Sequence, residues 1–190
     1  MKHVFPALAT ERLILRPLSP DDLEFVFQHF ATPDVGRYML DDAPVTTRAQ
    51  AQAILDFYLS PSASFHNRWV IVRRDDGRPI GTCGFHKWIQ PYHKVEIGYD
   101  LSPSAWKQGY MTEALHRILT YAFTEMAINR VEAVVYPQNS ASIRLAERLG
   151  FVREGLMREV ICRDGQFYDH WLMALLRRDW AGADEEMERE

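Results

Sequence analysis

A strand, a short loop with one glycine and an amphipathic helix follow one another between Leu101 and Leu115. The first turn of a helix has backbone N–H groups without intrahelical partners and carries the positive end of the helix dipole, so it can bind a phosphate group. Gly109 would let the backbone approach such an anion closely, and Lys107 adds positive charge. The segment therefore indicates a phosphate site, although a plain strand-to-helix loop has the same local features. Its glycine spacing is that of neither a P-loop nor a dinucleotide-binding fingerprint.

The elements that would position this loop change in type along the chain. Alternating apolar residues predict strands over 12–18, 69–72, 79–85, 95–101, 130–136, 151–162 and 167–175. Helical periodicity and start signals predict a helix after Ser19 and helices over 47–59, 110–126 and 140–149. Strands that begin as antiparallel hairpins and later alternate with helices indicate an α/β fold. We expect a mixed, mostly antiparallel central sheet of about six or seven strands, flanked by helices.

The composition excludes several classes of function. The chain has 190 residues and a net charge of -4, so it has no global positive field that would hold nucleic acid or anionic lipid. No apolar run approaches the roughly 20 residues that a membrane span needs. The N-terminus does not resemble a signal peptide, and a cytoplasmic protein is expected. Residues 1–180 are interpreted as a single domain, and the acidic residues 181–190 as a disordered tail.

Several longer motifs occur together and in a fixed order. They are TERLILRPL (10–18), EIGYDL (96–101), WKQGYMTEAL (106–115), NRVEAVVYPQNSASIRLAERLGFVREG (129–155) and DGQFYDHWLMALL (164–176). In order and spacing they resemble the GNAT superfamily of N-acetyltransferases, and most of all the branch with the Rim-type ribosomal-protein N-terminal acetyltransferases. The resemblance covers roughly residues 10–180. It implies the GNAT fold, acetyl-CoA as the acetyl donor and an amine as the acceptor.

The resemblance also implies which residues contact acetyl-CoA. In the superfamily the pyrophosphate lies on a loop with the pattern Arg/Gln-x-x-Gly-x-Gly/Ala, which falls here on residues 106–111. Only Gly109 matches a defined position, because Trp106 replaces the Arg/Gln and Met111 replaces the small residue. Such a loop acts mainly through backbone N–H groups, so these departures need not abolish binding. The expected phosphate contacts are Lys107, Gln108, Gly109, Tyr110, Met111 and Thr112.

Further cofactor contacts are expected outside the loop. The pantetheine arm of the family pairs with backbone near the end of the preceding strand, which is here the segment from Tyr99 to Leu101. Asn139 matches an Asn that contacts the cofactor in this branch, and it also suits the N-cap of the helix that follows. Arg144 is an expected neighbour of the cofactor.

Glu96 is the expected general base. On its strand it shares one face with Gly98 and Asp100. It lies five residues before Leu101, or ~16 Å along the strand, which is about the reach of an extended pantetheine arm. Glu96 could therefore lie near the acetyl group and act directly or through water. The alternative is a carboxylate that is solvated or ion-paired on the strand face.

Ser142 is the expected donor to the leaving group. Many superfamily members have a Tyr general acid on the helix that ends in Gly-Phe, but Ala146 occupies that position here. Ser142, one turn earlier, could donate a hydrogen bond to the departing sulfur, as in the Rim branch. A thiol with a reference pKa of ~8.5 needs only modest assistance to leave. The alternative is that Ser142 only helps to start its helix.

The predicted function is transfer of an acetyl group from acetyl-CoA to a primary amine by direct attack on the thioester. A protein N-terminal amine or a small-molecule amine is the expected acceptor. An α-amino group has a pKa of ~8 and is roughly one-tenth neutral at pH 7, whereas a lysine at ~10.4 needs far more help. The departures at Trp106, Met111 and Ala146 leave one alternative, a catalytically silent CoA-binding or regulatory module. The sequence is also compatible with a homodimer.

Overall fold

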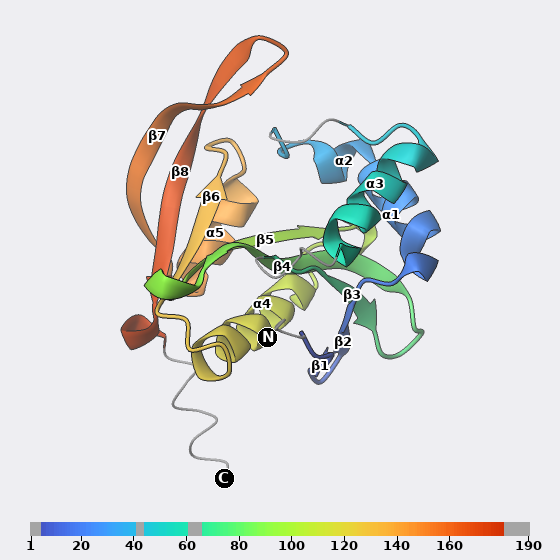
Figure 1. The fold of residues 1–190 in the computed structure, drawn as a ribbon, viewed down its shortest axis with the longest axis horizontal. Helices are drawn as coiled ribbons and strands as arrows, with labels where there is room; N and C mark the ends of the chain where they lie inside the picture. The colour runs from blue at the N-terminus through green and yellow to red at the C-terminus, as the bar shows by residue number, and fades with distance from the viewer. Residues whose placement is uncertain (1–4, 41–43, 61–65, 181–190) are drawn as a thin grey trace.

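An eight-stranded sheet runs through the part of the chain that the computed structural model describes, residues 5–40, 44–60 and 66–180 (Figure 1). Its strands lie in the order β1-β2-β3-β4-β5-β6-β8-β7. Their bounds are β1 Leu8–Ala9, β2 Leu13–Pro17, β3 Trp69–Arg73, β4 Pro79–Ile89, β5 Lys94–Leu101, β6 Arg130–Val135, β7 Val152–Arg163 and β8 Gln166–Leu176. Neighbours are antiparallel except for the parallel pair β5 and β6. The predicted mixed, mostly antiparallel sheet is confirmed. It has one strand more than expected, because the two residues of β1 are too few to show alternation.

The helices begin and end close to the predicted residues. Their bounds are α1 Leu23–Phe30, α2 Pro33–Gly36, α3 Arg48–Leu59, α4 Tyr110–Thr124 and α5 Ser140–Arg148. Thr47 caps α3, because its side chain accepts a hydrogen bond from the backbone N–H of Gln50. After Ser19 the chain first forms a 3-10 turn, η1 Pro20–Asp22, and only then α1. The four-residue α2 was not predicted. None of the described helices is long and apolar enough to cross a bilayer.

The helices pack on both faces of the sheet and form two hydrophobic clusters. The alternation of β3 divides its side chains between them. Val70 packs with α1 and α3, whereas Trp69 and Ile71 belong to the larger cluster with α4 and α5. Figure 1 shows α1 and α3 on one side of the central strands and α4 on the other. The predicted acidic tail, residues 181–190, lies outside the described residues.

The two parallel strands diverge. β5 and β6 pair from Lys94↔Arg130 to Glu96↔Glu132, and beyond that point the described parts of the two strands form no pair. On their outer sides both stay bonded, β5 to β4 up to Leu101 and β6 to β8 up to Val135. In Figure 1 the two strands run in clearly different directions. We call this unpaired stretch, between β5 from Ile97 onward and β6 from Ala133 onward, the gap in the sheet; its β5 side leads to the loop that precedes α4.

Candidate functional site

The predicted phosphate loop ends in a glycine with a left-handed backbone. Gly109 has φ +81° and is the N-cap of α4, a conformation that is unfavourable for any residue with a Cβ. The first intrahelical bond of α4 runs from Glu113 N to Gly109 O at 3.1 Å. The N–H groups of Tyr110, Met111 and Thr112 precede it and have no intrahelical acceptor. This geometry suits an anion at the helix start, and the glycine is needed for its positive φ as much as for its size.

The side chains of the loop do not crowd that helix start. Met111 is buried in the core, so the residue that replaces the small residue of the family pattern points away from the expected phosphate position. Trp106 turns back toward the sheet, where its Nε1 donates to the carbonyl oxygen of Leu101 at 2.7 Å. Lys107 and Gln108 are exposed. The loop therefore offers backbone N–H groups and one lysine to a ligand.

Arg12, at the start of β2, fixes the loop and was missed by the sequence analysis. Its Nε lies 2.6 Å from Glu113 Oε2 in α4, and one of its terminal nitrogens donates to the Gln108 carbonyl oxygen at 3.0 Å. Thr10 donates to the other Glu113 oxygen at 2.5 Å. These bonds connect the first strands of the sheet to the start of α4. They carry no local sequence signal, because the partners lie about a hundred residues apart.

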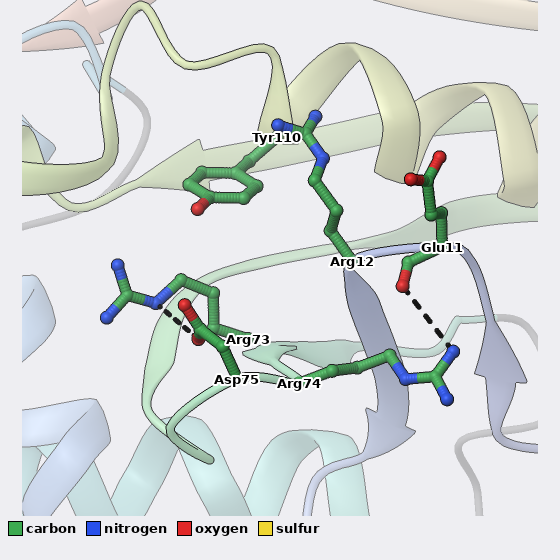
Figure 2. A pocket seen from close by; sticks show the side chains of 6 residues that line it. All are labelled: Glu11, Arg12, Arg73, Arg74, Asp75 and Tyr110. Carbon is green, nitrogen blue, oxygen red and sulfur yellow. Dashed lines mark hydrogen bonds and ion pairs between the residues drawn. The ribbon is translucent and has the colours of Figure 1, made fainter.

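A hollow of about 430 Å³ adjoins this anchor (Figure 2). Its lining consists of Glu11, Arg12, Arg73, Arg74, Asp75 and Tyr110. Arg12 passes beside the Tyr110 ring, with its guanidinium carbon 4.7 Å from the ring centroid, and Arg73 is paired with Asp75 at 3.1 Å. The hollow lies by β2 and β3, which β4 and β5 separate from the gap. Arg12 and Arg73 already have carboxylate partners, and Arg74 donates to the backbone oxygen of Thr10. Because none of the predicted catalytic residues lines the hollow, we do not assign the reaction to it.

The edge of β5 presents backbone groups to the gap. The N–H of Ser102 bonds to Ile80 of β4, whereas the carbonyl of His93 accepts from Arg130 on the β6 side. Residues two apart in a strand direct their backbone groups to the same side, so the N–H and C=O of Tyr99 face β6. The described part of β6 forms no pair there. This free edge is the backbone that the sequence assigned to the pantetheine arm.

The start of α5 lies across the gap from β5. Asn139 caps this helix, with its Oδ1 accepting from Ser142 N at 3.2 Å, so the N-cap interpretation of Asn139 is confirmed. The Tyr99 hydroxyl lies 2.9 Å from Ser142 Oγ. The structure thus brings together two residues that the sequence assigned separately, one to the cofactor and one to the leaving group. Arg144 is exposed on α5.

Glu96 lies on the opposite face of the sheet from Tyr99. Its carboxylate is 2.8 Å from Lys87 Nζ, and the Lys87 side chain is 70% exposed. The ion-paired state that the sequence left as an alternative is therefore present. Glu132, its in-register neighbour on β6, is held by both Lys94 and Arg130 at 2.9 and 2.8 Å. Burial raises the pKa of Glu132, but these cations outweigh it and leave the pKa lowered. Among the described residues Glu132 thus has two cationic partners, whereas Glu96 has one.

A buried ionic cluster underlies the same face, next to α1. Asp100, with a side chain only 3% exposed, is ion-paired with Arg68. It also accepts from His29 Nε2 at 2.5 Å and from the Thr82 hydroxyl at 2.7 Å. Burial raises the pKa of Asp100, but the charge of Arg68 and these hydrogen bonds outweigh it and bring the pKa to about 2. The cluster fixes α1, β4 and the residue that precedes β3 to the end of β5 that borders the gap.

His86 connects this cluster to Glu96. It faces Glu96 across the β4–β5 pair, and its Nε2 lies 3.1 Å from Arg68 and 3.4 Å from the Tyr58 hydroxyl. Burial and the nearby Arg68 charge lower the pKa of His86 to about 3. The ring is therefore neutral at pH 7, with Nε2 as the acceptor. Gly98 leaves room for it, since a Cβ there would lie 3.1 Å from His86 Nε2 and 3.2 Å from Arg68.

The site as a whole has two chemically different sides that meet at the gap. Glu96 and neutral His86 lie on the α1–α3 face. Tyr99 and Ser142 lie on the face of α4 and α5. A thioester in the gap would thus have a carboxylate on one side, where an amine must lose a proton, and hydroxyl groups on the other. The arrangement suits acyl transfer between two ligands that approach from opposite faces.

Comparisons with known proteins agree with this geometry. The family model described as acetyltransferase (GNAT) domain matches residues 12–152. The N-acetyltransferase p20 of Bacillus licheniformis is 38% identical over 92% of this chain and 98% of its own length. The ribosomal protein uS5 alanine N-acetyltransferase of Escherichia coli is 28% identical over 91% of this chain and 92% of its own. A GNAT-family acetyltransferase from Bacillus anthracis has a crystal structure that matches with a TM-score of 0.80 at 26% identity, over 90% of this chain and 99% of that one.

Proposed function

Since this chain belongs to the GNAT family of acetyltransferases, we propose that its acetyl donor lies along the free edge of β5 and that its acceptor amine approaches from the α1–α3 face. The chain is an acetyl-CoA-dependent N-acetyltransferase, as the sequence predicted. The family favours this enzyme over the alternative of a silent CoA-binding module. Met111 gives that alternative no support, because its side chain is buried away from the loop.

The proposed position of acetyl-CoA rests on the gap between β5 and β6. We place the pyrophosphate of acetyl-CoA on the backbone N–H groups at the start of α4, next to Gly109, with the exposed side chains of Lys107 and Gln108 beside it. The pantetheine arm adds to β5 as a further strand would, using the backbone N–H and C=O of Tyr99. Acetyl-CoA supplies the activated acetyl group. The chain supplies its position and donors for the charge that develops on the carbonyl oxygen.

Glu96 is the general base of the proposed mechanism. The amine nitrogen bonds to the acetyl carbon and loses a proton toward Glu96, directly or through water, while the carbon–sulfur bond breaks. Among the described residues Glu96 has one ion-pair partner, Lys87, which is largely exposed and can be displaced when an acceptor enters. Ser142, on the other face, donates a hydrogen bond to the departing sulfur.

The acceptor we propose is the α-amino group of a protein N-terminus. An α-amino group has a pKa of ~8 and is roughly one-tenth neutral at pH 7, so it needs only modest help from a general base, whereas a lysine at ~10.4 needs far more. The Escherichia coli relative is an alanine N-acetyltransferase of ribosomal protein uS5. A small-molecule amine is the other outcome of the test below. Homodimer formation and a cytoplasmic location stay predictions from the sequence.

The test measures CoA release with three acceptors. They are a peptide with a free N-terminal alanine, the same peptide with a blocked N-terminus and an internal lysine, and a small diamine. We expect the first to be turned over fastest. If the diamine is turned over fastest, the acceptor is a small-molecule amine and not a protein N-terminus. Absence of CoA release with every amine, in a protein that binds acetyl-CoA, would contradict the proposed reaction.

Glu96→Gln tests the base, with Glu154→Gln as the matched control. Both residues are strand carboxylates in ion pairs, but Glu154 lies on β7 and pairs with Arg130. We expect kcat for Glu96→Gln to fall by about 10²-fold or more, and to recover partly at high pH, where the amine is already neutral. The control should retain its activity. Near-normal turnover in Glu96→Gln would remove Glu96 from the mechanism.

A further inference from the structure

The hydroxyl of Tyr99 and that of Ser142 form a hydrogen bond that bridges the gap in the sheet. Tyr99 projects from β5, and Ser142 lies in the first turn of α5, which follows β6. The two oxygens are 2.9 Å apart, a normal O–H···O distance. The pair lies on the face of α4 and α5, where Tyr99 packs against the main core. The bond therefore crosses the space in which the thiol arm of the donor is proposed to lie.

We propose that Tyr99 is a positioning residue for the leaving group: its hydroxyl donates to Ser142 Oγ and so directs the Ser142 proton toward the departing sulfur. The inference rests on the proposed role of Ser142 and assigns Tyr99 a side-chain function beyond its backbone contact with the cofactor.

The direction of the hydrogen bond follows from the partners of each oxygen. The Tyr99 hydroxyl has two neighbours on Ser142, Oγ at 2.9 Å and the backbone oxygen at 3.4 Å. The backbone oxygen belongs to α5 and has the helical N–H four residues later as its own donor, so Oγ is the better acceptor. A phenol is also the stronger acid of the two hydroxyls. When Tyr99 donates to Oγ, the Ser142 proton has no other protein acceptor among the described residues and is left for a ligand.

The proton balance of this step is simple. The amine nitrogen gains a bond to the acetyl carbon and gives up one proton on the Glu96 side. The electron pair of the carbon–sulfur bond stays on sulfur, which leaves as a thiolate that accepts the Ser142 hydrogen bond and later takes a proton from water. Tyr99 keeps its proton throughout. Burial raises the pKa of Tyr99 and the Ser142 hydrogen bond only partly offsets this, so the phenol keeps its proton at neutral pH.

A double-mutant cycle tests the inference. Tyr99→Phe keeps the ring in the core and removes only the hydroxyl, and Ser142→Ala removes the group through which Tyr99 acts. We expect Tyr99→Phe to lower kcat about fivefold, the value of one hydrogen bond, and Ser142→Ala to lower it at least as much. In the Ser142→Ala background, Tyr99→Phe should have no further effect. Tyr92→Phe, at a site that is 73% exposed, is the matched control and should have wild-type kinetics.

A binding measurement separates this role from a merely structural one. Desulfo-CoA lacks the sulfur that Ser142 is proposed to meet, so the wild type should bind CoA more tightly than desulfo-CoA at pH 9, where the thiol is largely thiolate. Tyr99→Phe should reduce that preference about fivefold and leave the affinity for desulfo-CoA unchanged.

Each remaining outcome has a distinct meaning. If Ser142→Ala loses activity but Tyr99→Phe does not, the role of Tyr99 is overturned while the proposed function stands. If Tyr99→Phe lowers kcat by the same factor in the wild type and in the Ser142→Ala background, the role of Tyr99 is overturned too, because Tyr99 would then act by another route. If Tyr99→Phe weakens CoA and desulfo-CoA alike, its hydroxyl serves the fold of the gap and the inference fails. If neither substitution lowers kcat, the proposed role of Ser142 fails together with the inference.

Discussion

Replacing Asp100 by Asn is expected to destabilise the protein more than the loss of any exposed ion pair. The Asp100 side chain is 3% exposed and that of Arg68 is 7% exposed. The two carboxylate oxygens of Asp100 accept hydrogen bonds from Arg68, from His29 and from both the hydroxyl and the backbone N–H of Thr82. Asparagine keeps the shape but removes the charge, and it turns one acceptor into a donor that faces other donors. The Arg68 guanidinium is then buried without its counter-charge, which costs about 3–5 kcal/mol.

Urea unfolding at pH 7 measures this loss as a shift of the midpoint. Glu24→Gln is the control, because Glu24 pairs with Arg48 at a site where both side chains are more than half exposed, and it should cause no resolvable change. Adding Arg68→Met to Asp100→Asn should restore part of the lost stability, since the uncompensated charge is removed. The difference between Asp100→Asn and wild type should narrow as the pH falls from about 4 toward 2, because the unfolded wild type takes up a proton on Asp100 there while the folded protein, with a pKa of about 2, does not. A loss under about 1 kcal/mol at pH 7 would refute the reasoning.

Three further predictions concern the loop and the acceptor side. Gly109→Ala should lower the free energy of unfolding by about 1 kcal/mol and raise the KM for acetyl-CoA, because Gly109 has φ +81°. Gly155→Ala is the control, because a Cβ at Gly155 would meet open space. Equal effects of the two substitutions would contradict the prediction. Glu113→Gln should raise the KM for acetyl-CoA by about threefold to tenfold with less change in kcat, because it weakens the ion pair through which Arg12 holds the start of α4. An unchanged KM in steady-state assays would show that this ion pair does not position the loop. His86 has a pKa of about 3 in the folded protein and an ordinary value near 6.5 when unfolded, so the unfolded state binds more protons between these pH values and stability falls as the pH falls through them. His86→Gln should flatten that dependence by up to about 1.4 kcal/mol per pH unit between pH 3.5 and 6, and urea titrations with parallel slopes for the two proteins would contradict it.

Local patterns in the sequence predicted most of the fold. Alternation and helical periodicity depend on residues close together in the chain, so they gave seven of the eight strands and the helices α3, α4 and α5 to within a few residues. They missed β1 and α2, which are too short for a pattern. The glycine before α4 was also predictable, because its type alone signals a special backbone.

Other site features depended on where distant segments meet. Arg12 and Glu113 are 101 residues apart, and His29 and Asp100 are 71 apart. Each is an ordinary charged or polar residue in its own segment, and only the packing of one element on another pairs them. The alternation of β5 placed Asp100 on the face of Glu96, but its partners could not be read from the strand.

The phosphate loop likewise has some features that the sequence determined and others that only the tertiary structure decided. The sequence by itself determined a strand, a glycine and an amphipathic helix in that order, because backbone conformation and amphipathicity are local properties. Only the tertiary structure decided that Met111 is buried, that Trp106 bonds to the end of β5, and that β5 separates from β6 beyond Glu96. It alone brought Tyr99 to Ser142, 43 residues away. The reason is that the gap between two diverging strands arises from the packing of the whole sheet, which no single segment encodes.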